Sequence, residues 1–211
     1  MSSIHLELLD KERQATFERL KIFRNQATLA GGTALCLQIG HRLSFDFDLF
    51  LEREIKNKDF LNLKRIFKLR EIRIRTTEQI TVITGEDVGV TLVYYPYHPL
   101  FEKVATPSVP LFSVKDIAAD KAYTIGQRAT WRDYVDLFFI LKWKYANILD
   151  VVRWAQKKFG VEFNPQLFLE QLNYFEDLEF PKMTFVKEEY SVVEIQEFLK
   201  KEVLRYTRKN L

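Results

Sequence analysis

The sequence predicts an α+β fold in which a mixed β-sheet with flanking helices is followed by a C-terminal helical bundle. Three runs of strand-like composition lie close together in the first half of the 211-residue chain, at residues 71–76, 80–84 and 88–95. Prolines then punctuate the segment up to Pro110, and beyond it apolar residues recur with helical spacing. We therefore expect a domain that contains the sheet over residues 1–110 and a helical domain over residues 111–211.

The composition indicates a globular protein, since 47% of the residues are hydrophobic and only seven are glycine. Cys36 is the single cysteine, so an internal disulfide is excluded, and we expect it in the core. No apolar leader and no run of eighteen apolar residues is visible, so we expect a cytoplasmic protein without a membrane segment. The net charge of +3 and basic stretches at 64–75 and 200–209 allow a nucleic-acid partner, although such stretches are also common on solvated faces.

The remaining elements follow from apolar periodicity and capping residues. Residues 4–25 predict an amphipathic helix that packs on the sheet. Asn57 is a candidate N-cap for a helix over the following ten residues. In the second half, Ser191 and Glu194 form a capping box for a last helix towards Tyr206. Before it we expect helices at residues 114–128, 131–145, 148–159 and 166–175.

Most of the chemical information lies between Leu29 and Phe50. From Ser44 to Leu49 polar and apolar residues alternate strictly, which is typical of a half-buried strand. Asp46 and Asp48 then share one face about 6 to 7 Å apart, where they can bind a hard cation such as Mg²⁺ or Mn²⁺ with the Ser44 hydroxyl beside them. The same pattern also fits an ordinary exposed strand, and sugar-nucleotide transferases use D-x-D as well.

Upstream of these aspartates, a Gly-Gly turn precedes a short apolar helix. Gly31, Gly32 and Thr33 open this helix, and its unpaired first-turn amides form an anion site that a phosphate can approach closely. Arg42, just before the acidic strand, is a further candidate for binding nucleotide or phosphate. Together these parts suit metal-dependent nucleotidyl transfer from an NTP, because amides would hold the distal phosphates while carboxylates hold the bridging metal.

A second set of charged residues lies on two consecutive predicted helices. Lys121 and Arg128 are seven residues apart and lie roughly on one face, as do Asp133 and Asp136, which are three apart. A lysine can neutralise charge that develops on a leaving pyrophosphate, and an arginine can bind it with two hydrogen bonds. Spacing alone favours the alternative, a surface network of ion pairs among Asp120, Lys121, Arg128, Arg132 and Asp133.

Two sequence blocks carry a resemblance to a known family. G-G-T from Gly31, followed by H-R-x-S-x-D-x-D, resembles the first motif of the AbiEii/AbiGii toxin family. V-K-D-I-A-A-D-K-A-Y-T-I-G-Q-R and R-D-Y-V-D-L, between Val114 and Leu137, resemble a second block, so that the likeness spans roughly residues 29–140. The resemblance implies a nucleotidyltransferase-type sheet of the DNA polymerase β type, and functional roles for Lys121 and the aspartates of the second block.

The same resemblance implies a biological setting. Its members are nucleotidyltransferase toxins of bacterial toxin-antitoxin and phage-abortive systems. For this chain it implies an NTP substrate, a cognate antitoxin as partner, and RNA, especially tRNA, or a protein side chain as acceptor of the nucleotide.

One departure from the family pattern concerns the metal site. Many polymerase β type transferases take a third metal-binding carboxylate from a later strand, but residues 88–95 contain none and Asp87 only precedes them. The role could pass to Asp133 or Asp136, or the site could bind a single metal. A non-catalytic nucleotide-binding or regulatory protein on the same fold is the alternative function.

Overall fold

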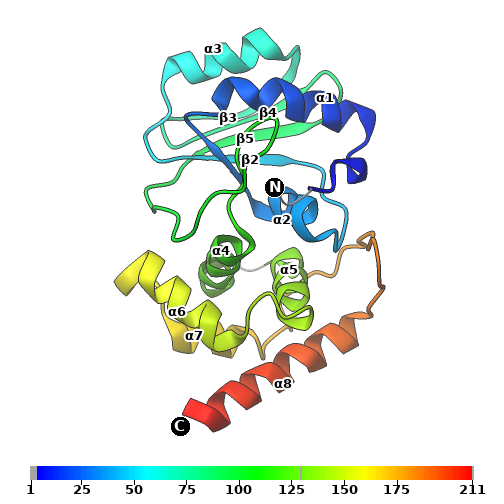
Figure 1. The fold of residues 1–211 in the computed structure, drawn as a ribbon, viewed down its shortest axis with the longest axis vertical. Helices are drawn as coiled ribbons and strands as arrows, with labels where there is room; N and C mark the ends of the chain where they lie inside the picture. Colours follow the sequence, from blue (N-terminus) through cyan, green and yellow to red (C-terminus); the bar gives the residue numbers. More distant parts are fainter. Residues whose placement is uncertain (1–3, 129, 211) are drawn as a thin grey trace. The chain divides into compact units, whose positions relative to one another are not determined.

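The computed structural model describes residues 4–128 and 130–210, without the side chains of residues 209 and 210. The basic residue Lys209, part of the second basic stretch, therefore has a side chain outside the described set. The chain divides into two compact units, Met1–Ser113 and Val114–Leu211 (Figure 1). The first contains the sheet and the second contains helices, so the predicted α+β class is confirmed.

Within the described residues, the first unit is built on a five-stranded sheet with the order β1-β2-β5-β4-β3 (Figure 1). The parallel pair is β2 with β5, whereas the other neighbours are antiparallel, so the sheet is mixed. The three strands expected from residues 71–95 are confirmed to within two residues at each end. The strands are β1 (Thr28–Ala30), β2 (Phe47–Leu51), β3 (Leu69–Arg75), β4 (Gln79–Thr84) and β5 (Gly89–Tyr94).

Helices cover both sides of this sheet. Figure 1 shows α1 (Lys11–Arg19) and α3 (Asn57–Ile66) on one side and α2 (Gly31–Ile39) on the other. The ring of Phe17 in α1 stacks on that of Phe47 in β2, with 6.1 Å between the centroids. Because β2 buries Phe47, Leu49 and Leu51 on this side, its alternate residues face the other side of the sheet.

The expected continuous helix over residues 4–25 is wrong. The segment divides into 3-10 turns at Leu6–Leu8 and Leu20–Phe23 on either side of α1. The cause is local: the Asp10 carboxylate accepts a hydrogen bond from the Arg13 amide at 2.8 Å and so caps a helix that begins at Lys11. The predicted N-cap of α3 is also displaced by one residue, since the cap is Lys56 and Asn57 is the first helical residue.

The second unit consists of helices packed around aromatic side chains. The helices expected at 114–128 and 148–159 are confirmed, and Ser191 caps the last helix through Glu194 as predicted, its amide donating to that carboxylate at 2.8 Å. Tyr134, Phe138, Phe139 and Phe168 are almost wholly buried. The helices are α4 (Val114–Arg128), α5 (Trp131–Lys142), α6 (Ile148–Phe159), α7 (Pro165–Gln171) and α8 (Val192–Asn210).

Three of these helices end elsewhere than expected. α5 and α7 stop three and four residues early, whereas α8 runs four residues beyond Tyr206. Within the described parts of the chain, none of the helices combines the length and apolar content needed to cross a membrane.

Candidate active site

The strand predicted from Ser44 to Leu49 begins later than expected, because β2 starts at Phe47. The Thr33 hydroxyl of α2 is hydrogen-bonded to the Asp46 carbonyl oxygen and lies 2.9 Å from the Ser44 Oγ. The backbone before Phe47 is therefore held by a helix residue rather than by a neighbouring strand. Asp46 precedes the strand and is exposed, and Asp48 is the second residue of the strand.

The start of α2 lies directly against the second aspartate. Gly31 is the first residue of α2 and has φ +68°, a conformation that side-chain-bearing residues rarely adopt. A Cβ added at Gly31 would lie 3.0 Å from Asp48 Oδ2, and one added at Gly32 would lie 2.6 Å from Arg42 Nη2 and 3.1 Å from Ser44 Oγ. The two glycines thus let the first turn of α2 approach the predicted phosphate and metal residues.

The guanidinium of Arg42 adds a buried positive charge to this place. The residue is only 4% exposed, and its Nη1 donates to the Leu43 carbonyl oxygen at 3.1 Å. Its Nη2 lies against Gly32, at the amino end of α2. The helix terminus and the arginine therefore favour an anion at the same position.

The neighbouring strand β5 completes the surroundings of the aspartates. Asp48 pairs in register with Thr91, and a Cβ added at Gly89 would overlap the Asp46 carboxylate. The Thr91 hydroxyl lies 3.3 Å from that of Thr81 on β4. Thus the strand position beside Asp48 carries a hydroxyl, and Asp87 lies in the turn before β5, paired with Arg70 at 2.7 Å.

Gly89 and Thr91 were not singled out from the sequence. Their signal was the V-G-V-T alternation of residues 88–91, which predicts a strand but does not indicate which strand lies beside it. Only the parallel pairing of β2 with β5 brings these residues to Asp46 and Asp48.

The oxygen atoms gathered here suit a hard divalent cation. Asp46 and Asp48 supply carboxylates, Ser44 and Thr91 supply hydroxyls, and the missing Cβ atoms of Gly31 and Gly89 let both carboxylates lie close against the backbone. Among the described residues, no group of three or more His, Cys, Asp or Glu side chains is arranged to hold a metal ion. Two carboxylates with neighbouring hydroxyls are donors that fit a cation such as Mg²⁺, which proteins commonly bind through one or two carboxylates.

In the second unit, the structure brings Lys121 together with both predicted aspartates. Its Nζ lies 2.8 Å from Asp133 Oδ1 and 2.6 Å from Asp136 Oδ2. Lys121 is 8% exposed and Asp136 is fully buried, so the ion pairs of the alternative interpretation are present but lie in the interior rather than on the surface. Burial lowers the pKa of Lys121, but the charges of Asp136 and Asp133 outweigh this effect and raise the pKa above its usual value.

Arg128 is not part of that cluster. It is exposed at the end of α4 and lines a pocket of about 290 Å³ together with Gln127, Gln171 and Asp177, whereas Lys121 is not a lining residue. The shared face expected for Lys121 and Arg128 therefore does not bring the two side chains into one site.

A second buried lysine was missed from the sequence. Lys158 of α6 lies 2.7 Å from Asp120 Oδ1 and 3.4 Å from Asp116 Oδ1, and its side chain is fully buried. The available signal was that Asp116 and Asp120 are four residues apart and flank Ala118 and Ala119 on α4. The lysine that joins them comes from another helix, which helical spacing cannot reveal.

Comparison with known proteins places the chain in a family. Residues 65–201 match the model of the AbiEii nucleotidyl transferase toxin, described as part of a type IV toxin-antitoxin system. The chain belongs to this AbiEii family. The matched region contains Lys121, Asp133 and Asp136 and begins after the Gly31–Asp48 segment.

Similar proteins can be aligned with nearly the whole length of this AbiEii chain. An uncharacterized protein of Aquifex aeolicus is 30% identical over 205 residues, which cover 94% of this chain and 97% of the relative. A Helicobacter pylori protein assigned as a nucleotidyltransferase has a TM-score of 0.63 and 17% identity, with 95% of this chain and 97% of that chain covered. MenT4, a nucleotidyltransferase toxin of Mycobacterium tuberculosis, has a TM-score of 0.60 and 17% identity, with 93% and 82% covered. The two structures show that the fold is that of nucleotidyltransferases.

Proposed function

We propose that this AbiEii-family chain transfers a nucleotide from an NTP to an RNA acceptor, with release of pyrophosphate and with a divalent cation bound by Asp46 and Asp48. One observation carries the proposal: the first turn of α2 lies against Asp48, at 3.0 Å from the Cβ position of Gly31 to the carboxylate. An anion site and a pair of cation ligands thus adjoin each other, which is the arrangement that a metal-bound triphosphate requires.

Each residue of this site has a separate role in the proposal. Asp46 and Asp48 would hold a divalent cation, which would supply positive charge to offset the negative charge that builds up on the phosphates during transfer. The amides of Gly32 and Thr33, with Arg42, bind the distal phosphates, and Ser44 donates a hydrogen bond to the same group. The Thr33 hydroxyl also positions Asp46, because it donates a hydrogen bond to the Asp46 carbonyl oxygen. We infer one cation rather than two, because Thr91 offers no charge at the strand position beside Asp48.

We extend the proposal to the cluster on α4 and α5. Lys121 is held protonated by Asp133 and Asp136, and a protonated lysine suits the role of neutralising a leaving pyrophosphate. This role is supported by the fact that Lys121, Asp133 and Asp136 all lie inside the region that matches the family model. Arg128 remains a predicted phosphate contact, on the basis of its charge and its exposed position in a pocket.

The partners follow from the family. The family description names a toxin-antitoxin system, so we propose that a cognate antitoxin neutralises this chain. RNA is the proposed acceptor because the chain carries a dense set of exposed cations on its first unit, whereas a protein acceptor has no comparable feature in its favour.

Incubation with each radiolabelled NTP, Mg²⁺ and total cellular RNA tests the proposal. We expect label to enter RNA with one preferred nucleotide, to require Mg²⁺ or Mn²⁺, and to be lost with EDTA, because two carboxylates repel a triphosphate unless a cation lies between them. If the label enters protein instead of RNA, the acceptor is a protein and the proposed RNA acceptor is wrong. Metal-dependent NTP binding without any transfer would favour the non-catalytic nucleotide-binding alternative.

A further inference from the structure

The first unit carries an unusually basic segment that the proposed active site does not use. Residues 53–75 contain nine Lys or Arg against three Asp or Glu, although the whole chain has a net charge of only +3. The rest of the chain is therefore net negative. Eight of these cations are exposed and define what we call the α3-β3 surface: Lys56, Lys58, Lys64, Arg65, Lys68, Arg70, Arg73 and Arg75.

Few of these cations are neutralised locally. Arg70 and Arg73 each have an acidic neighbour, at 2.7 Å and 3.2 Å, but both pairs are about half exposed and so leave much of their charge accessible to other ligands. Among the described residues, no acidic side chain lies within ion-pairing distance of Lys56, Arg65 or Lys68. The surface thus presents a positive field that favours a polyanion.

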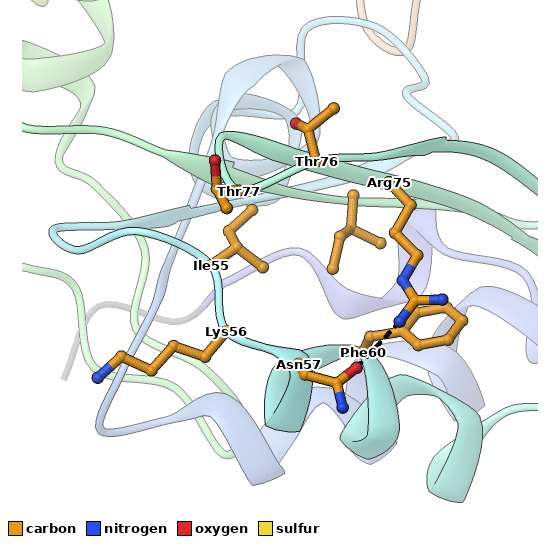
Figure 2. A pocket seen from close by; sticks show the side chains of 8 residues that line it. Ile55, Lys56, Asn57, Phe60, Arg75, Thr76 and Thr77 are labelled. Carbon is orange, nitrogen blue, oxygen red and sulfur yellow. Dashed lines mark hydrogen bonds between the residues drawn. The ribbon is translucent and has the colours of Figure 1, made fainter.

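A pocket of about 270 Å³ opens on this surface (Figure 2). Ile55, Phe60 and Ile80 are its apolar lining residues. Lys56 and Arg75 are its cationic lining residues, and Figure 2 shows their side chains extending in opposite directions. Asn57, Thr76 and Thr77 add polar groups. Its volume lies just below the range of about 300–1,000 Å³ that is typical of small-ligand sites, so the pocket can take one small unit of a larger ligand.

The walls of the pocket are held in place by contacts of their own. The Arg75 guanidinium lies 4.0 Å from the centroid of the Phe60 ring and donates to Asn57 Oδ1 at 2.9 Å, as Figure 2 shows. The buried Asp59 carboxylate binds Arg53 with two hydrogen bonds, at 2.7 and 2.9 Å, and also accepts from the Lys56 amide. The start of α3 and the end of β3 are thereby fixed before any ligand arrives, which lowers the entropy cost of binding.

Two kinds of macromolecule can be compared as occupants. β3 is an edge strand, and an acidic peptide could in principle add a strand to it. However, β3 has two register irregularities in its pairing with β4, and outward arginines of this kind protect an edge from strand addition. An RNA backbone needs no regular edge, only cations along its path. The seven residues of β3 span about 23 Å, enough for several successive phosphates.

We propose that the α3-β3 surface binds the phosphate backbone of the acceptor RNA and that the pocket beside Arg75 receives one nucleotide of it. The role of this RNA as the acceptor rests on the proposed function, whereas the binding of RNA to the surface does not. In the complex, Arg65 of α3, Lys68 and Arg73 contact successive phosphates, and Arg75 binds the phosphate of the nucleotide that enters the pocket.

The test measures RNA binding directly, without NTP. Fluorescence anisotropy with a labelled RNA hairpin that has a single-stranded end is recorded against salt for the wild type and for Arg65→Gln/Arg73→Gln. Each lost phosphate contact removes about 0.7 to 0.9 from the slope of log K against log salt, so we expect the slope to fall by about 1.5 and affinity at about 0.1 M salt to fall at least tenfold. Arg75→Gln tests the pocket and should weaken binding of the single-stranded end more than that of the duplex part.

The matched control is Arg153→Gln/Lys157→Gln on α6, which removes the same charge from exposed positions of the second unit. It should bind RNA like the wild type, and thermal melts should show that all variants are folded. Equal losses in the control, or an unchanged slope in Arg65→Gln/Arg73→Gln, would overturn the proposal. The proposal would also be overturned if Arg65→Gln/Arg73→Gln bound a labelled polyglutamate peptide more weakly than the wild type does but bound RNA equally well.

The outcome also separates this inference from the proposed reaction. If the variant loses RNA affinity but the wild type transfers no nucleotide to any RNA, the surface is correct and the reaction is wrong. If the wild type labels RNA and the variant does so with unchanged KM, the reaction is correct and the surface is wrong. A raised KM for RNA with unchanged kcat supports both.

Discussion

Each unit of the molecule holds one pair of the aspartates that the sequence predicts for the site, and the two pairs have different surroundings. Asp133 and Asp136 of α5 contact the buried Lys121 at 2.8 and 2.6 Å. Asp46 and Asp48 lie instead where any side chain at residues 89 and 31 would crowd their carboxylates. The first pair is held by one buried lysine from a neighbouring helix, whereas the second lies against two glycine backbones, at the start of α2 and in β5. Residue spacing alone cannot distinguish these two cases, because the deciding neighbours come from other elements.

The largest effect that distinguishes the pairs is expected for Asp46→Asn. The side chain is exposed, so the free energy of unfolding should change by no more than about 0.5 kcal/mol. Nucleotide transfer should fall at least about 1,000-fold, because a neutral amide is a poor ligand for the cation that stabilises the transferring phosphate. Urea denaturation and labelled-NTP transfer measure the two quantities. Normal transfer by this variant would remove the D-x-D pair from the active site.

The opposite behaviour is expected in the second pair. Lys121→Ala leaves the fully buried Asp136 without its cation and should lower the free energy of unfolding by about 3 to 5 kcal/mol. Chemical denaturation checks this value. Replacing both partners, as in Lys121→Met/Asp136→Leu, should recover most of the loss, since no buried charge then remains unpaired. If Lys121→Ala has unchanged stability, the lysine is not a structural partner of these aspartates and the comparison fails.

A smaller effect is expected from crowding the first pair. Gly89→Ala adds a methyl group that overlaps the Asp46 carboxylate and must displace it. A displacement of about 1 Å can cost about 100-fold in rate, so transfer should fall by roughly that factor while the protein stays folded. Gly126→Ala on α4 is the matched control, because nothing lies within 4 Å of its added Cβ. The control should keep full activity and gain about 0.5 to 1 kcal/mol in stability.

The smallest effect is a pH dependence that belongs only to the lysine pair. The pKa of Lys121 is raised in the folded state, so protonated Lys121 contributes stability at all pH values below its unfolded pKa of about 10.4. This contribution is lost as pH rises from there through the folded pKa. The stability difference between the wild type and Lys121→Met should therefore be constant from pH 7 to about 10 and shrink above it. A difference that already shrinks near neutral pH would contradict the raised pKa.

Local patterns predicted the elements well where only local contacts decide them. The strands β3, β4 and β5 and the helices α4 and α6 follow from periodicity, and the Ser191 cap of α8 follows from its glutamate partner three residues later. Two errors have different origins: the predicted helix over residues 4–25 is interrupted by the local cap at Asp10, whereas the late start of β2 involves a side chain from another element. β2 begins at Phe47 because the carbonyl oxygen of Asp46 accepts a hydrogen bond from the Thr33 hydroxyl rather than from a neighbouring strand. The alternation of polar and apolar residues gives no indication of that contact.

The candidate site was predicted in a similarly uneven way. Gly31, Ser44, Asp46 and Asp48 are joined through one short helix, so the sequence could anticipate that they converge. Thr91 joins them from a strand more than forty residues away, and Lys158 joins α6 to α4 in the same manner. Long-range pairing of this kind depends on sheet order and helix packing, which short sequence windows do not contain.

The parallel pairing of β2 with β5 also has a consequence for when the protein becomes active. Asp48 and Thr91, which pair in register, are separated in the sequence by α3 and the β3-β4 hairpin. Their pairing is therefore non-local, and it forms only when a long loop closes at a cost in conformational entropy. During synthesis, a nascent chain exposes Asp46 and Asp48 well before β5 has left the ribosome. The surroundings of the two aspartates are completed only by that later strand. Under the proposed function, the site of Asp46 and Asp48 is therefore incomplete until β5 has emerged and paired with β2.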